Sequence, residues 1–359
     1  MTDCSSISSE TEAPRRRVDF IDALRGYAIL MMLQGHTVDV VLCESCRKPE
    51  HFAYFLWDRL RGLTAPTFFF AAGLIFAYLL LREEARAPGS NARLGKGLLR
   101  VVWLLVLGFL AQFHFYDLER ILRGAPDRWE FLSSSHVLHS IALTLLLILG
   151  VFWLVRRGPR HLALLVWLGV GLLSFLLAGF IAPWSPSTFP WTWISLFTSR
   201  ETAYFALFPW AGFGLAGAAF GGLLWVTRWH ERGWFSGSLA GVGAILLLVC
   251  APFGGEHGWL TFRLAAGIFL LGLVGLLCLR GWMPEFVLRA GRETLTLFLL
   301  HVVVLYGGLT GYGLHLLWPR ELGAGPTLLL ALSMVASFAL LAWHLPTLRR
   351  WCPPLRWIR

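Results

Sequence analysis

The sequence predicts an all-α, polytopic integral membrane protein with about ten transmembrane helices in one bundle. Of its 359 residues, 57% are hydrophobic and only 14% are charged, whereas a soluble domain carries about 25% charged residues. Runs of about 20 mostly apolar residues recur along the whole chain, and each is long enough to cross a bilayer as a helix. These runs do not alternate apolar and polar residues, which argues against the strands of a membrane barrel.

We expect one transmembrane domain, residues 18–345, between two polar ends. Residues 1–17 are expected to be a disordered cytoplasmic tail, and residues 346–359 a basic cytoplasmic tail. The predicted spans are 19–42, 62–81, 97–115, 137–155, 161–181, 203–226, 236–252, 261–279, 293–314 and 325–344.

The basic residues predict that both chain ends are cytoplasmic. The net charge is +10, but its carriers lie in the segments between the spans, so no nucleic-acid partner is expected. With the N-terminus inside, 20 Lys and Arg residues fall on the cytoplasmic side, 10 fall on the outer side, and Arg25 lies within a span. This excess is the one that the positive-inside rule describes. The chain is therefore expected to be a multi-pass protein of the cell membrane (the inner or plasma membrane).

The first span carries ionisable residues that are costly in lipid. Arg25 and His36 are eleven residues apart, which on an ideal helix places them within about 20° of one face and about 16 Å apart along the axis. Asp22 precedes Arg25 by three residues, and Asp39 follows His36 by three, so each pair can touch. We expect this stripe to face the bundle interior or a wet cavity.

The stripe has the residue types of a two-ended chemical site. A histidine beside a carboxylate can act as a general base, because the carboxylate fixes the tautomer and stabilises the cation. Arginine offers a forked donor for phosphate or carboxylate. The alternatives are structural roles: Asp22 and Arg25 only anchor the end of the helix, and His36 packs inertly within the bundle.

Three further histidines are candidates for lining an acceptor site. His136 and His139 stand at the start of the fourth span, and His301 lies inside the ninth span, eight residues after Glu293. Two histidines without a supporting cysteine or carboxylate do not make a zinc site, so no metal is expected. The alternatives are an interfacial, solvated pair for the first two and an interhelical hydrogen bond for His301.

Two local patterns have structural interpretations. The glycine-rich sixth span, "GFGLAGAAFGG", favours close helix packing over a phosphate loop. Cys43 and Cys46 form a C-x-x-C without the βαβ setting of a redox protein, so a local disulfide or two free thiols are favoured over catalysis.

Several of these motifs together resemble a known family. They are "IDALRG" at the start of the first span, the Arg25–x10–His36 spacing, "LTAPTFFFAAG" at residues 63–73 and "GRETLTLFLLH" at residues 291–301. The chain looks like bacterial proteins of the heparan-α-glucosaminide N-acetyltransferase-like family, which belongs with the acyltransferase-3 proteins in a transmembrane acyltransferase superfamily. The middle of the chain matches only in hydropathy.

The resemblance implies an acyltransferase. It implies that an acyl-CoA, expected to be acetyl-CoA, is bound from the cytoplasm with Arg25 and Asp22 at its site. A hydroxyl or amine acceptor, often on a sugar, is met at the other face, where His36 and Asp39 are the implied catalytic residues. In the N-acetyltransferase pattern the catalytic histidine lies in the loop after the first helix, where this chain offers only His51. The match at His36 is closer to the acyltransferase-3 pattern.

Two rival functions remain at this point. A transporter or flippase of a small polar or lipid-linked substrate would use Arg25 and His36 for binding or proton coupling. Against it, the chain shows no internal repeat of the kind found in many transporters. A purely structural assembly protein would leave the polar stripe without purpose. The sequence leaves open whether the protein is a monomer or a homo-oligomer.

Overall fold

The computed structural model describes residues 18–181, 205–250 and 255–351 as an all-α polytopic membrane protein. The predicted N-terminal tail and residues 352–359 of the predicted C-terminal tail lie outside these ranges. Within them the only β-type pairing is an isolated bridge between Leu42 and Leu322. The longer helices are α1 (Asp19–Val41), α3 (Thr64–Arg86), α4 (Ala92–Gln112), α7 (Val137–Val155), α8 (Arg160–Ile181), α10 (Leu207–Thr227), α11 (Gly233–Cys250), α12 (Gly255–Leu279), α13 (Glu285–Arg292) followed by α14 (Thr294–Tyr306), and α15 (Ala324–Trp351).

Each of the ten predicted spans overlaps one of these helices, and the ninth, 293–314, overlaps α14 but not α13. By length and composition, seven helices of the described chain could cross a membrane, or eight if α13 and α14, bent by 83°, form one broken span. α1 is not among the seven, since its polar stripe lowers its hydropathy, and α11 is one of the shorter apolar helices. The number ten therefore stays a prediction.

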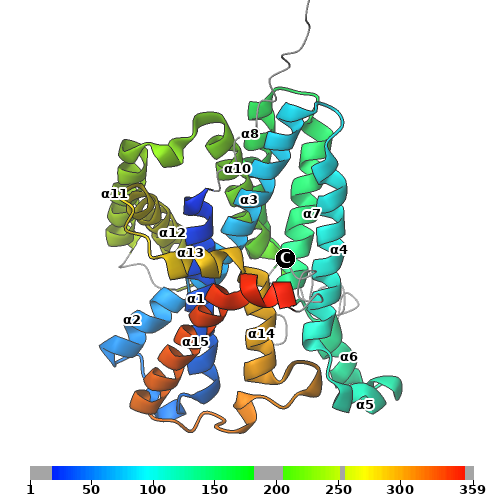
Figure 1. Ribbon diagram of the computed structural model, residues 1–359, viewed down its shortest axis with the longest axis vertical. Coiled ribbons are helices and arrows are strands. Elements are labelled where there is room, and N and C mark those ends of the chain that lie inside the picture. Colours follow the sequence, from blue (N-terminus) through cyan, green and yellow to red (C-terminus); the bar gives the residue numbers. More distant parts are fainter. Residues whose placement is uncertain (1–17, 182–204, 251–254, 352–359) are drawn as a thin grey trace, which may run out of the picture.

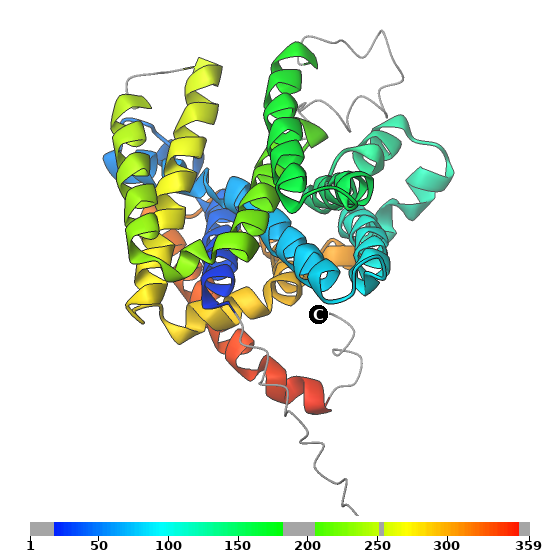
Figure 2. The same cartoon turned by 90° about the horizontal axis from the view of Figure 1, so that it is seen from above.

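α1 occupies the centre of the bundle. It packs against α3, α12, α13, α14 and α15, with α11 and α12 on one side and α3, α4, α7, α8 and α10 on the other (Figures 1 and 2). The connections 87–91 and 156–159 lie at one end of the molecule, and the segment 307–323 lies at the opposite end (Figure 1). The polar stripe of α1 is therefore enclosed by protein over most of its length.

The glycine-rich α10 packs closely against α3, as predicted. A Cβ atom on Gly217 would lie 2.1 Å from the carbonyl oxygen of Phe70, and one on Gly221 would lie 2.2 Å from that of Leu74. α1 and α13 cross in the same way, since a Cβ on Gly291 would lie 1.8 Å from the carbonyl oxygen of Asp22. These contacts are with backbone atoms, so only a shift of a whole helix could relieve them.

We expect Gly217→Val to destabilise the protein strongly. Overpacking a tight interface costs about 1–3 kcal/mol and more where backbone must move, and the missing Cβ at Gly217 faces backbone. The measurement is the thermal midpoint of the detergent-solubilised protein. Gly150→Val is the matched control, because a Cβ there meets nothing within 4 Å. Equal midpoints for the two variants would contradict the packing argument.

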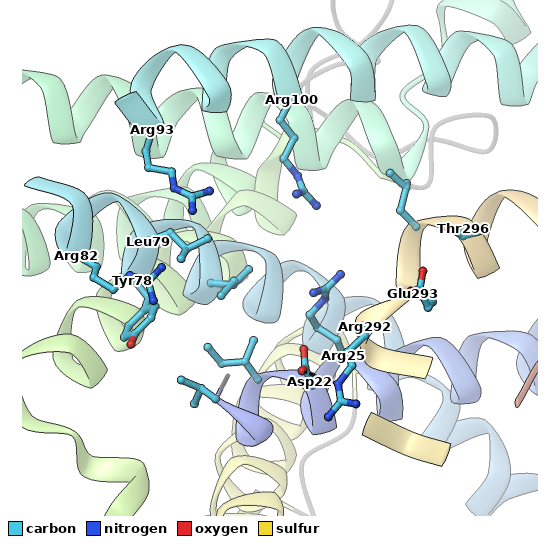
Figure 3. A pocket seen from close by; sticks show the side chains of 14 residues that line it. Asp22, Arg25, Tyr78, Leu79, Arg82, Arg93, Arg100, Arg292, Glu293 and Thr296 are labelled. Carbon is cyan, nitrogen blue, oxygen red and sulfur yellow. Dashed lines mark hydrogen bonds and ion pairs between the residues drawn. The ribbon is translucent and has the colours of Figure 1, made fainter. Parts of the chain in front are cut away.

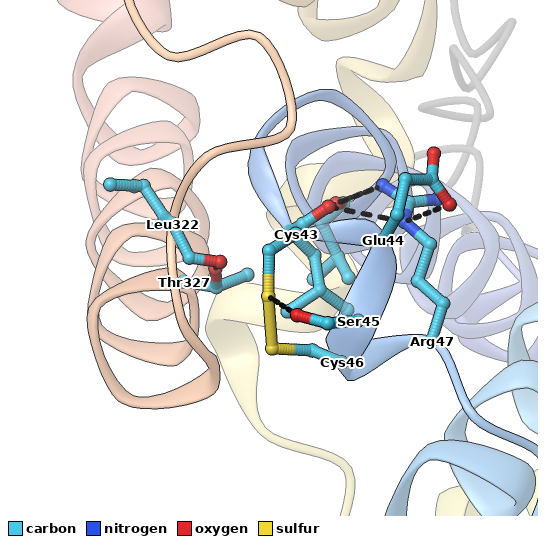
Figure 4. Close-up of a disulfide and its surroundings, with 9 residues drawn as sticks. Cys43, Glu44, Ser45, Cys46, Arg47, Leu322 and Thr327 are labelled. Atoms are coloured by element: carbon cyan, nitrogen blue, oxygen red, sulfur yellow. Dashed lines mark hydrogen bonds and ion pairs between the residues drawn. A yellow bond between two sulfur atoms is a disulfide. The ribbon is translucent and has the colours of Figure 1, made fainter.

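The end of α1 near His36 is tied to the segment before α15. Cys43 and Cys46 form a disulfide, which decides between the two interpretations that the sequence left open (Figure 4). The Cys43 amide donates to the Leu322 carbonyl at 2.8 Å, and the Leu322 amide donates to Val41 at 2.8 Å. An ion pair between Glu44 and Arg320 at 2.5 Å adds to this connection.

α15 extends six residues beyond the boundary predicted at residue 345. It stays helical to Trp351 because its last turns have partners in the bundle. The Arg289 guanidinium of α13 lies 3.8 Å from the ring centroid of Trp343, and Arg349 is buried in an ion pair with Glu293. The start of the predicted basic tail is thus part of the folded domain.

Candidate functional site

A basic cavity lies at the end of α1 that carries Arg25. Its volume is about 480 Å³, and its walls come from α1, α3, α4 and the α13–α14 break (Figure 3). The lining side chains include Asp22, Glu293 and Tyr78, and five arginines: Arg25, Arg82, Arg93, Arg100 and Arg292. The structure therefore places Asp22 and Arg25 together at the wall of one cavity.

Both acidic residues of this cavity are paired with arginines. Arg292 donates to Asp22 at 3.3 Å. Arg349 holds Glu293 with one hydrogen bond to Oε1 at 2.7 Å and an ion-pair contact to Oε2 at 2.6 Å. The acidic side chains are thus already neutralised.

Three arginines of the cavity have no acidic partner within the described chain. Arg82 lies over the ring of Tyr78 at 5.7 Å, while the guanidinium groups of Arg93 and Arg100 form no hydrogen bond or ion pair in the ranges that the structure describes. An unpaired cation in a membrane bundle is expensive, and guanidinium groups match phosphate with two parallel hydrogen bonds. The cavity is consequently suited to a ligand that carries several negative charges.

These three arginines were not singled out from the sequence. Arg93 lies just before the third predicted span and Arg100 lies at its start, where the positive-inside rule alone accounts for basic residues. Their spacing of seven residues, two helical turns, was the available signal, because it places both on one face of α4.

The other end of the stripe gathers aromatic and imidazole rings from α1 and α14. His36 Nδ1 lies 3.1 Å from the hydroxyl of Tyr306, and the rings of His36 and His301 have centroids 5.4 Å apart. Phe298 contacts both His301, at 5.1 Å, and His136, at 6.2 Å between centroids. The predicted residues His36, His136 and His301 are thus brought to one region, which we call the histidine cluster.

Asp39 does not contact His36, contrary to the expectation from their spacing. It forms ion pairs with Arg61, and with Arg47 at 3.8 Å. Arg61 reaches it across Gly35, where a Cβ would lie 3.3 Å from the Arg61 Cγ. A permanent guanidinium charge is a stronger partner for a carboxylate than a neutral imidazole. The group that hydrogen-bonds to His36 is Tyr306, which sequence reasoning missed.

His139 has a structural role in the fold. It is buried, its Nδ1 accepts from the amide of His136 at 3.3 Å, and its Nε2 donates to the Leu105 carbonyl at 3.2 Å. Together with the His136 side chain, which accepts from the Leu138 amide, it caps α7. With both ring nitrogens occupied, His139 is less suited to lining an acceptor site than His136.

His301 has a defined tautomer, because its Nδ1 is hydrogen-bonded to the carbonyl of Phe298. A carbonyl only accepts, so Nδ1 carries the proton and Nε2 of the neutral ring is an acceptor. His301 is 1% exposed, whereas His36 and His136 are half-buried. His51 is exposed and precedes α2 (Phe52–Arg61).

The residues described include no group of three or more His, Cys, Asp or Glu side chains arranged to hold a metal ion. The histidine cluster has the features of an acid–base site: one imidazole bonded to a phenol and a second imidazole beside it. The arrangement can accept a proton at one ring and hold a polar group at the next.

Comparison with known proteins identifies one family whose model matches this chain. A family model described as "Heparan-alpha-glucosaminide N-acetyltransferase, catalytic" matches residues 17–253. No curated protein matches. The matched region contains α1, α3, α4 and α7, whereas Glu293, His301 and Tyr306 follow it in the chain.

Proposed function

The chain belongs to the heparan-alpha-glucosaminide N-acetyltransferase catalytic family, and on that premise we propose that it transfers an acetyl group from acetyl-CoA to a hydroxyl or amine, with a sugar as the expected acceptor. The observation that carries this proposal is the two-ended stripe of α1. One end opens on a cavity with three arginines that lack an acidic partner in the described chain, and the other end carries the histidine cluster.

The arginine cavity is proposed as the donor site. Coenzyme A carries its phosphates on a nucleotide, and Arg82, Arg93 and Arg100 can neutralise them while Tyr78 offers a ring near the base. The thiol arm is flexible and extended. The rise of α1 between Arg25 and His36 is about 16 Å, a length that an extended arm of this kind can span. The volume of about 480 Å³ accommodates the nucleotide end.

His36 is the proposed general base. Its Nδ1 is engaged by Tyr306, so Nε2 is the nitrogen that faces a proton of the acceptor. As Nε2 takes that proton, the acceptor oxygen or nitrogen attacks the thioester carbonyl, and the departing thiolate of CoA receives the proton from the imidazolium. A second route has His36 accept the acyl group first. Acceptor-free incubation with labelled acetyl-CoA separates the two, since only the second route leaves label on the protein.

The sidedness of the reaction is part of the proposal. The excess of basic residues on one set of connections favours the cytoplasm for the Arg25 end, where acetyl-CoA is available. The acceptor would then meet the histidine cluster from the opposite face. His136 and His301 are proposed to contact it there, and Asp39 to act indirectly by holding Arg61 beside the cluster.

The test is release of CoA from acetyl-CoA by the purified protein in the presence of candidate sugar acceptors. We expect acetyl transfer to at least one amino sugar or hydroxyl sugar. The transporter alternative predicts a different result: substrate would accumulate in sealed vesicles and no acetyl-CoA would be consumed. That outcome would end the acetyltransferase proposal.

Tyr306→Phe is expected to lower kcat about fivefold without changing the KM for acetyl-CoA. The substitution removes one hydrogen bond to His36, and such a bond contributes about 1 kcal/mol, which is a factor of about five in rate. Steady-state kinetics with varied donor check the prediction. Tyr312→Phe serves as the control because Tyr312 is 80% exposed. If kcat is unchanged in Tyr306→Phe, the Tyr306 hydroxyl does not orient His36 during turnover.

A further inference from the structure

Glu293 has an unusual place in the donor cavity. It lies at the 83° break between α13 and α14, it lines the cavity (Figure 3), and it is only 6% exposed. A carboxylate in this position would repel the phosphates that the neighbouring arginines are suited to bind. A buried carboxylate also needs a charged partner to remain ionised at low cost.

The partner comes from the last turns of α15. Arg349 Nη1 donates to Glu293 Oε1 at 2.7 Å, and Arg349 Nη2 lies 2.6 Å from Oε2, so the guanidinium fork holds both oxygens. The same Nη2 donates to the hydroxyl of Thr296 at 3.0 Å. Arg349 is 9% exposed and does not line the cavity itself. It therefore acts on the cavity through two residues that do line it.

We propose that Arg349 is a positioning residue of the donor site, through which the C-terminal helix makes the cavity able to bind a polyanion. It cancels the charge of Glu293 and fixes the broken α13–α14 segment that forms one wall. This inference rests on the proposed function, and it assigns a role in donor binding to a residue about a hundred positions beyond the family match, which ends at residue 253.

The charge argument makes a specific prediction for paired substitutions. Arg349→Gln leaves Glu293 buried without its neutralising partner, so donor binding should weaken about tenfold or more, because the charge of the remaining carboxylate is no longer compensated. Glu293→Gln combined with Arg349→Gln removes both charges and leaves two amides that can pair. The double variant should recover donor binding to near the wild-type value. Arg349→Lys should be intermediate, because lysine cannot form the fork.

The experiment is calorimetric titration of the full-length, detergent-solubilised protein with coenzyme A. The variants are Arg349→Gln, the double variant and Arg350→Gln, whose exposed side chain makes it the matched control for loss of one positive charge. Steady-state kinetics on the same preparations should show a raised KM for acetyl-CoA in Arg349→Gln with little change in kcat. A merely structural role would instead lower the thermal midpoint and kcat together, and the double variant would not recover.

The results separate this inference from the proposed function. If the wild-type protein binds no coenzyme A, the proposed function fails and the role of Arg349 fails with it. If the wild-type protein binds coenzyme A and Arg349→Gln binds it equally well, only the role of Arg349 is overturned. If the double variant recovers its affinity for coenzyme A and Arg350→Gln keeps the wild-type affinity, the charge argument is supported directly.

Discussion

His36→Ala is expected to lower kcat by about 10²–10⁴, the range that a positioned general base contributes. His36 lies at the far end of the stripe from the arginine cavity, at a rise of about 16 Å from Arg25. The affinity for acetyl-CoA should therefore stay near that of the wild-type protein. The measurement is the steady-state rate of acetyl transfer, together with a coenzyme A titration that confirms the donor site is intact.

His51→Ala is the decisive companion to this variant. His51 is the one histidine in the segment between α1 and α2, the place where the related N-acetyltransferase pattern has its catalytic histidine, and its side chain is exposed outside the histidine cluster. We expect His51→Ala to retain activity. If His51→Ala is inactive and His36→Ala is active, His51 is the general base and the proposed role of His36 is refuted.

The fold was predictable because membrane helices are specified by local composition. A run of about 20 apolar residues can satisfy its backbone in lipid only as a helix, so the predicted spans correspond to helices of the structure. The close packing of α3 and α10 was likewise visible in the glycines of one span. The break between α13 and α14 was not foreseen, because the segment at Glu293 carries no proline and Gly291 alone does not specify a bend of 83°.

The candidate site was predictable only within one helix. The spacing of Arg25 and His36 follows from helix geometry, and the structure places the two at opposite ends of one stripe. The contacts that complete each end join distant parts of the chain: Tyr306 reaches His36 across 270 residues, and Arg349 reaches Glu293 across 56 residues. Hydropathy and spacing contain no information on such pairs.

Asp39 shows how a correct spacing can lead to a wrong contact. Three residues separate it from His36, and this separation permits contact on a helix. A stronger partner decided the outcome, since Arg61 at the end of α2 brings a permanent charge to the carboxylate. Sequence patterns indicate which contacts are possible, whereas the neighbouring elements determine which of them form.

The combined variant Arg93→Gln and Arg100→Gln is expected to weaken acetyl-CoA binding by roughly 10²-fold or more. A hydrogen bond to a charged group contributes about 1.5–3 kcal/mol, which is roughly ten- to a hundredfold in affinity for each arginine. Neither arginine has an acidic partner within the described residues, so their removal leaves no carboxylate unpaired and should not unfold the protein. Titration with coenzyme A gives the affinity, and kcat at saturating donor should change little because both side chains are remote from His36.

Three comparisons sharpen this prediction. Arg86→Gln removes a positive charge from the exposed end of α3, outside the cavity, and should leave the affinity unchanged; an equal loss there would mean that general surface charge attracts the donor. If the 3′-phosphate contacts Arg93 or Arg100, coenzyme A lacking that phosphate should bind the wild-type protein and the combined variant with similar affinities. Raised salt should weaken binding to the wild-type protein more than to the variant, because two of the charge contacts that salt screens are already absent. Coenzyme A affinity that is unchanged in the combined variant would remove the arginine cavity as the donor site while leaving the histidine cluster to be tested separately.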